Sequence, residues 1–249
     1  NWIATKMPDG HWISEARIRG AKLITIATEY QSTSNKADEV IVIRPATDAA
    51  FALGVAQVLL RDALFDVDYV KRHTDLPLLV RLDTLKLLRA GDILPGYTPA
   101  TLTNYVQVLP AGQKPPADYA VQDRQYIPDA LRTKWGDFVV WDANASAPAV
   151  ITRDHVGDVY TNAFPAAGKD PALTGTYTVT LADGVTTVQV RSVFDLIKEY
   201  LDANFAPATV EEITGAPATA VESFARAVAA NKNKTLFAVG MGPHHYWNN

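Results

Sequence analysis

The sequence predicts an α/β fold, and two features carry that prediction. Between Lys22 and Leu60, two short apolar runs of strand length, Leu23–Ala27 and Val40–Ile43, are each followed by a polar turn, and the second turn opens a long helix. Short runs rich in β-branched residues are typical of buried strands. Strand-like segments lie next to helical segments both here and after residue 192, which predicts a Rossmann-like parallel sheet layered with helices.

The middle of the chain differs in composition. From Pro95 to Pro171 it is rich in Pro, Gly, Ala and Asp, and a hairpin is expected around the Asp183-Gly184 turn. We therefore expect an irregular, partly β insertion at 77–192, between a first part of the α/β body at 1–76 and its return at 193–249. Short strands are expected in the insertion at Tyr105–Leu109, Phe138–Asp142 and Ala149–Thr152.

Local signals mark the elements of the first part. A helix is expected to begin near Pro8 and to end before Gly20, and a single helical turn fits Ser34–Glu39. The long helix Asp48–Leu64 is apolar on almost every side, so we expect it between layers rather than on a wet surface. A shorter amphipathic helix is expected at Val67–His73.

The return to the α/β body is expected to hold three helices and a strand. Two of the helices are expected to open with a capping box, Ser192 with Asp195 and Thr209 with Glu212. The expected elements are helices at Ser192–Asn204, Thr209–Gly215 and Pro217–Ala230 and a strand at Thr235–Val239.

Composition narrows the classes of function. The chain has 249 residues, a formal net charge of −4 and no basic block, so nucleic acid is not an expected partner. Cysteine is absent, so the chain cannot supply thiolate ligands or disulfides. No run approaches the length of a membrane span, and no signal peptide is recognisable. The opening at Asn1 without Met predicts an internal piece of a longer protein.

Two acidic residues follow the predicted strands. Asp48 opens the long helix, and its carboxylate offers two adjacent acceptors that match the N1–H and N2–H donors of guanine; alternatively, it only complements the helix dipole. Glu29 lies just beyond a strand, where an acidic residue commonly binds a ribose hydroxyl, and its alternative is a solvated loop carboxylate. Thr28 adds a hydroxyl beside Glu29.

A glycine pair follows the last predicted strand. Gly240 and Gly242 bracket Met241 and would let the backbone approach a ligand and donate N–H groups to an anion, although a lone G-x-G is weak evidence. His244 and His245 are adjacent, so in an extended chain only one of them faces a ligand. No nucleophile elbow, P-loop or H-E-x-x-H pattern is present, so the catalytic residues are unknown and no metal site is expected.

Several motifs occur in a fixed order along the chain. They are Asn1, Gly20–Ile24, Ala37-Asp38 before Val40–Ile43, Pro45–Ala50, Val210–Gly215 and Phe237–Gly242. In these motifs and their order the chain resembles the large catalytic subunits of the molybdopterin oxidoreductases, the dimethyl-sulfoxide-reductase superfamily. The sequence departs from the pattern at Thr28, where the family usually has Pro, and at Ala46, where it usually has Gly, so the backbone paths of these two loops are expected to differ slightly.

Two further stretches indicate a branch of that family. Thr74–Arg81 and the insertion after it resemble the branch with respiratory nitrate reductase, nitrite oxidoreductase, perchlorate reductase and ethylbenzene dehydrogenase. The opening Asn1–Asp9 looks most like nitrite oxidoreductase alpha subunits. The resemblance implies oxidation of nitrite to nitrate, with reduction of nitrate, perchlorate or selenate as the alternative. An NAD-dependent dehydrogenase is disfavoured because G-x-G-x-x-G is missing, and a non-catalytic α/β binding module is the remaining alternative.

The resemblance also implies a cofactor, partners and a location. The cofactor is molybdenum bis(molybdopterin guanine dinucleotide), and a [4Fe-4S] cluster is expected in the parent protein with its ligands outside this fragment, which alone could not turn over substrate. An iron–sulfur beta subunit and a membrane or haem gamma subunit are expected, in a membrane-associated complex on the periplasmic or, alternatively, the cytoplasmic side, with a small oxyanion as substrate. The implied cofactor-binding residues are Asn1, Thr28, Glu29, Thr47, Asp48, Gly240, Met241, Gly242 and His244.

Overall fold

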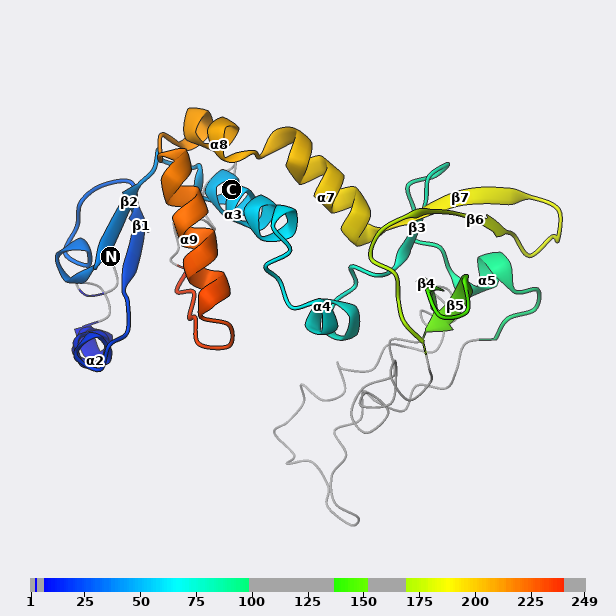
Figure 1. Cartoon of the computed structure of the whole chain (residues 1–249), viewed down its shortest axis with the longest axis horizontal. Coiled ribbons are helices and arrows are strands. Elements are labelled where there is room, and N and C mark those ends of the chain that lie inside the picture. The colour runs from blue at the N-terminus through cyan, green and yellow to red at the C-terminus, as the bar shows by residue number, and fades with distance from the viewer. Residues whose placement is uncertain (1–2, 4–6, 99–136, 152–168, 240–249) are drawn as a thin grey trace, which may run out of the picture. The chain divides into compact units, whose positions relative to one another are not determined.

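The computed structural model describes residues 3, 7–98, 137–151 and 169–239 (Figure 1). The described residues group into two compact units. The first unit comprises those up to Phe65 and from Lys198 onward, and the second comprises those from Asp66 to Ile197. The three-part division at 1–76, 77–192 and 193–249 stays a prediction.

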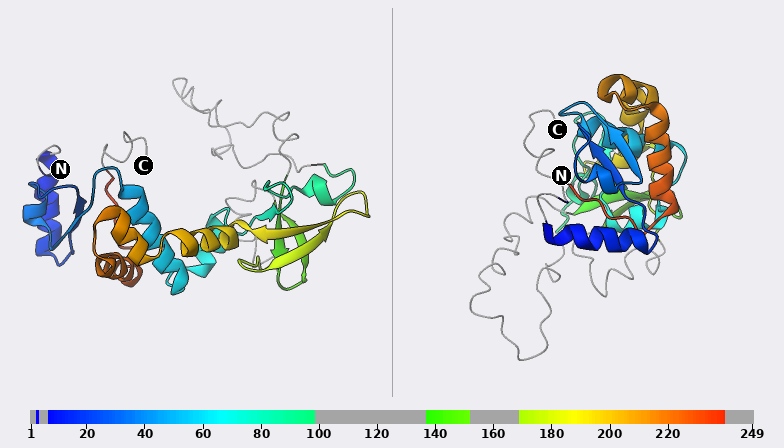
Figure 2. Two further views of the ribbon diagram at one scale, coloured as in Figure 1. Left: turned by 90° about the horizontal axis from the view of Figure 1, so that it is seen from above. Right: turned by 90° about the vertical axis from the view of Figure 1, so that its left-hand side faces the viewer.

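The first unit contains two parallel strands, which Figure 2 shows side by side. β1 (Ile24–Ala27) pairs with β2 (Glu39–Val42) along its whole length. Helix α2 (Met7–Ile18) precedes β1, and the 3-10 turn η1 (Ser34–Lys36) lies between the strands in the sequence. A parallel pair needs such a crossover connection, because each strand must start from the same edge of the sheet.

Three helices pack together beside these strands. α3 (Asp48–Arg61) contacts α8 (Pro207–Thr214) and α9 (Ala218–Ala230), and α7 (Val193–Asn204) precedes α8. Gly54 of α3 permits the close approach, since a Cβ there would lie 2.6 Å from a methyl carbon of Val210. The buried core of the unit consists of Ile41, Ile43, Phe51, Val55, Val58, Val210, Ala216, Val221 and Ala225.

The second unit is built from antiparallel strands. β7 (Thr187–Ser192) lies between β3 (Leu79–Arg81) and β6 (Thr176–Thr180), and β4 (Phe138–Asp142) pairs with β5 (Ala147–Ile151). Two short helices, α4 (Val67–His73) and α5 (Ala90–Ile93), belong to the same unit. Its buried core consists of Leu79, Leu88, Val139, Val179, Val188 and Val190.

The predicted α/β class is confirmed, and so are most of the local elements. The helix predicted at Asp48–Leu64 ends at Arg61, and it packs against two other helices as its apolar surface required. The predicted cap of α7 is half formed, because the Ser192 hydroxyl accepts from the Asp195 N–H at 3.0 Å while the Asp195 carboxylate accepts from Arg191 Nε at 2.8 Å. The strand predicted at Tyr105–Leu109 lies outside the described residues.

Two local predictions are wrong. Helix α8 begins at Pro207 rather than Thr209, because proline has the backbone angle of a first helical residue and lacks the N–H that would be left unpaired there. The segment Thr235–Val239 is not a strand. A strand needs a neighbouring backbone to accept and donate its hydrogen bonds, and among the described residues none pairs with this segment. Its Leu236 side chain is 84% exposed.

Candidate functional site

The parallel pairing of β1 and β2 brings two loops to one edge of the sheet. Ala27 at the end of β1 lies opposite Val42 at the end of β2, and the Ile43 N–H extends the pairing by donating to the Ala27 carbonyl at 3.0 Å. Residues that follow the two strands therefore emerge on the same side. In α/β sheets, ligands bind beyond the carboxyl ends of the strands, so this edge is the candidate site.

The first loop presents two polar side chains to solvent. Thr28 and Glu29 follow the buried Ala27 directly, and both are exposed. Among the residues that the structure describes, neither side chain takes part in a hydrogen bond or an ion pair. Both are therefore able to meet a ligand without first breaking an internal contact with the described chain.

The second loop leads from β2 into α3. Thr47 is the N-cap of α3, yet its hydroxyl does not cap the helix; it donates instead to the Arg44 carbonyl at 2.7 Å. Ala46 has φ = 62°, in the left-handed region that favours glycine. Asp48 is the first residue of α3 and is half-buried, at the end where the helix dipole favours a negative charge.

Four of the nine residues predicted to bind a cofactor therefore lie at this edge. They are Thr28, Glu29, Thr47 and Asp48. The other five, Asn1, Gly240, Met241, Gly242 and His244, lie outside the described residues. Reasoning from sequence missed the part that Arg44 plays in this loop, because its partners lie 168 and 169 residues away and no local signal identifies them.

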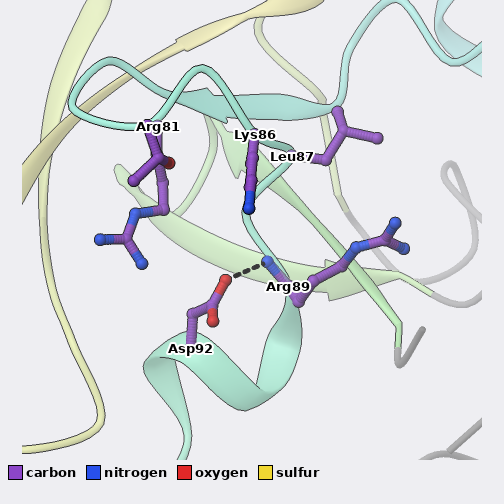
Figure 3. A pocket seen from close by; sticks show the side chains of 6 residues that line it. Arg81, Lys86, Leu87, Arg89 and Asp92 are labelled. Carbon is purple, nitrogen blue, oxygen red and sulfur yellow. Dashed lines mark hydrogen bonds between the residues drawn. The ribbon is translucent and has the colours of Figure 1, made fainter. Parts of the chain in front are cut away.

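The second unit contains an open pocket of about 530 Å³ (Figure 3). It is lined by Arg81, Thr84, Lys86, Leu87, Arg89 and Asp92. Arg81 is paired with Asp83 at 2.7 Å, and the Arg89 guanidinium lies over the Phe138 ring at 4.1 Å. The cationic side chains point apart in Figure 3 rather than toward one point. We therefore place the candidate site in the first unit.

The described residues contain neither a helix suited to cross a membrane nor a cluster of metal-ligating side chains. None of the helices within them combines the length and the apolar character that a membrane crossing requires. No group of three or more His, Cys, Asp or Glu side chains within the same residues is arranged to hold a metal ion.

Comparison with known proteins shows similarity along the whole chain. It is 31% identical over 255 residues to the perchlorate reductase subunit alpha of Dechloromonas aromatica, covering 99% of this chain and 24% of that protein. It is 30% identical over 253 residues to the respiratory nitrate reductase subunit alpha of Haloferax mediterranei, covering 100% of this chain and 22% of that protein. The respiratory nitrate reductase 2 alpha chain of Escherichia coli is 24% identical over 301 residues, with 98% and 23% covered.

All three of these relatives are named as alpha subunits or chains of perchlorate or nitrate reductases. No family model matches the chain, and the chain spans about a quarter of the length of these curated relatives. The order of motifs and the similarity over the full chain agree, and the chain belongs to the molybdopterin oxidoreductases of the dimethyl-sulfoxide-reductase superfamily. The alpha subunits of this family imply a molybdenum–pterin cofactor.

Proposed function

We propose that this chain is the part of a molybdenum oxidoreductase alpha subunit that holds one guanine dinucleotide arm of a molybdenum bis(molybdopterin guanine dinucleotide). One observation carries the proposal: residues implied in cofactor binding, Thr28 and Glu29 after β1 and Thr47 and Asp48 after β2, share the carboxyl edge of a parallel strand pair. When bound, the molybdenum–pterin group supplies the oxygen-transfer and redox chemistry, and the protein orients it.

The polar groups at this edge fit the guanosine end of such a cofactor. The Asp48 carboxylate has two acceptor oxygens for the N1–H and N2–H donors of guanine. The exposed Glu29 carboxylate and Thr28 hydroxyl suit the ribose, which presents hydroxyl groups. None of these three side chains, Thr28, Glu29 and Asp48, carries a positive charge. A phosphate is bound by hydrogen-bond donors and positive charge, so these side chains favour a base and a sugar over a phosphate.

For the reaction, we propose the oxidation of nitrite to nitrate. Nitrite gains one oxygen atom that derives from water, two protons are released, and two electrons leave through iron–sulfur clusters toward a beta subunit. Support for nitrite comes from the resemblance of Asn1–Asp9 to nitrite oxidoreductase alpha subunits. The names of the relatives give equal support to a second candidate, the reduction of nitrate or perchlorate, in which the oxyanion loses an oxygen atom and takes up two electrons and two protons to form water.

The rest of the assembly follows from the same proposal. A [4Fe-4S] cluster in the parent protein would take its thiolate ligands from outside these 249 residues, since they contain no cysteine. We propose an iron–sulfur beta subunit and a membrane or haem gamma subunit as partners. The complex would be membrane-associated on the periplasmic side, with the cytoplasmic side as the alternative.

Cofactor and activity measurements on the purified complete enzyme test this proposal. We expect molybdenum by metal analysis, pterin fluorescence after oxidation, and guanosine monophosphate (GMP) after acid hydrolysis. Assays with nitrite, nitrate, perchlorate and selenate then separate the two candidate reactions. Finding neither molybdenum nor pterin would leave a non-catalytic α/β binding module as the better interpretation.

A further inference from the structure

Arg44 joins the loop before α3 to the end of α8. Its backbone N–H donates to the Thr214 carbonyl at 2.7 Å. Its guanidinium Nη1 donates to the Ile213 carbonyl at 2.9 Å and also to the Glu212 carbonyl. The last carbonyls of a helix have no partner within the helix and carry the negative end of its dipole, so a guanidinium is well suited to them.

The end of α8 is itself fixed in place. Thr214 is fully buried, its hydroxyl donates to the Val210 carbonyl at 2.7 Å, and the same oxygen accepts from the Ala216 N–H at 3.1 Å. Gly215 follows in the left-handed region at φ = 76°, and a Cβ built there would lie 3.8 Å from the Arg44 side chain. Arg44 is therefore held against an anchored helix end rather than a mobile surface.

Arg44 also contacts the loop Pro45–Asp48, the site loop, through its backbone carbonyl. Its carbonyl accepts the hydrogen bond from the Thr47 hydroxyl at 2.7 Å. Between them, Ala46 holds φ = 62°, a conformation that costs an L-residue free energy. The loop sequence alone does not favour this path, so the contacts of Arg44 at its start and of Thr47 at its end must maintain it.

We propose that Arg44 is a positioning residue for the guanine nucleotide: by clamping the start of the Pro45–Asp48 loop to the C-terminal turn of α8, it holds Asp48 where the guanine base is bound. This inference rests on the proposed function. Arg44 is exposed, and exposed charged contacts add little to global stability. Its loss should therefore release the loop, and with it the nucleotide, more than it unfolds the protein.

The test compares two arginines of the first unit in the complete enzyme. Arg44→Gln removes the charged donor, whereas Arg44→Lys keeps one that can reach the same carbonyls. Arg61→Gln is the matched control, since Arg61 also ties α3 to a distant segment, through Glu222 of α9 at 3.0 Å, but at the other end of the helix. Three quantities are measured. The first is the half-life of protein-bound cofactor during dialysis, with the cofactor quantified as the GMP that acid hydrolysis releases. The others are the urea midpoint of unfolding and amide hydrogen exchange over Thr47–Phe51.

We expect Arg44→Gln to shorten cofactor retention by roughly tenfold, because two charge-assisted hydrogen bonds of the loop are lost. Exchange over Thr47–Phe51 should speed up, and Arg44→Lys should restore most of the retention. Arg61→Gln should leave retention, exchange over Thr47–Phe51 and the urea midpoint near the parent values, because Arg61 is also exposed. Equal retention in Arg44→Gln and the parent enzyme would overturn the role of Arg44 while leaving the proposed function intact. A parent enzyme that releases no GMP would overturn both.

If Arg44→Gln does not fold, Arg44→Lys is compared with Arg61→Gln. Cofactor retention and amide exchange at the parent level in Arg44→Lys support the clamp. Faster loss of cofactor and faster exchange over Thr47–Phe51 in both Arg44→Lys and Arg61→Gln contradict it.

Discussion

The two units differ in what becomes of the polar side chains at their strand ends. In the first unit, parallel pairing directs Thr28 and Glu29 to the same edge as Asp48. In the second unit, antiparallel strands alternate in direction, and charged groups beside them pair locally, as in Arg81 with Asp83 and Arg191 with Asp195. Here the parallel pair brings together loops that follow different strands, whereas these two ion pairs of the antiparallel sheet join residues two and four positions apart.

The units also differ in how their cores are assembled. The first core joins Val58 of α3 to Val210 of α8 and Val221 of α9, which lie over 150 residues further along the chain. Much of the second core comes from a single hairpin, with Val179 on one strand and Val188 on the other. Contacts between distant segments should make the first unit the more sensitive to a change in helix packing.

Gly54→Ala tests that sensitivity. The added methyl would lie 2.6 Å from a Val210 methyl carbon, so α3 and α8 must separate or Val210 must shift, and we expect a loss of roughly 1–3 kcal/mol in the free energy of unfolding. Gly91→Ala in the second unit is the control, since a Cβ there meets nothing within 4 Å. Urea unfolding of both variants measures the difference. Equal stability would mean that the close approach of α3 to α8 does not matter, and partial recovery in Gly54→Ala/Val210→Ala would confirm the clash.

A pair of opposite substitutions tests backbone strain in the two units. Ala46→Gly should relieve the left-handed conformation of the site loop and stabilise the first unit by up to about 1 kcal/mol. Gly184→Ala should impose the same conformation on alanine in the β6–β7 turn, at φ = 74° with open space around it, and destabilise the second unit by about 1 kcal/mol. Thermal unfolding with hydrogen exchange resolved by unit measures both; a change of the same sign in both variants would contradict the strain in Ala46.

The dependence of stability on pH, measured at acidic pH, tests the ion pair between Arg17 and Asp38. The hydrogen bond from Arg17, followed by that from the Leu23 N–H, lowers the pKa of Asp38 to about 2. The pKa of an aspartate in an unfolded chain is about 3.9, so as the pH falls Asp38 takes up its proton in the unfolded chain before it does so in the folded one. The contribution of Asp38 is therefore complete above about pH 4 and is lost progressively toward pH 2.

Urea midpoints between pH 2 and pH 6 would show this loss, and Asp38→Asn should remove that part of the pH dependence. The effect should be the smallest of those proposed here, because the Arg17 and Asp38 side chains are each 33% exposed. Identical pH profiles for the parent and Asp38→Asn proteins would mean that the pair contributes nothing.

The sequence was sufficient where structure depends on neighbouring residues. The Asp183-Gly184 turn, the end of α8 at Gly215 and the Ser192 cap were all readable from local patterns. It was insufficient where partners are distant: Arg44 finds its carbonyls only after the chain has returned, and Thr235–Val239 needs a neighbouring strand that its own residues cannot specify. Of the candidate site, the sequence predicted the residues after β1 and β2, and the register of the strands explains why they lie at one edge of the sheet.

The most direct test of the central claim compares Asp48→Ala with Asp68→Ala in the complete enzyme. Each aspartate lies in the first turn of its helix, so each substitution removes a charge that complements a helix dipole. Only Asp48→Ala should also remove the paired acceptor for guanine, at a cost of roughly 1.5–3 kcal/mol in nucleotide binding. We expect GMP per molybdenum to fall in Asp48→Ala and to stay at the parent level in Asp68→Ala; equal GMP content in all three proteins would contradict a guanine site at the end of β2.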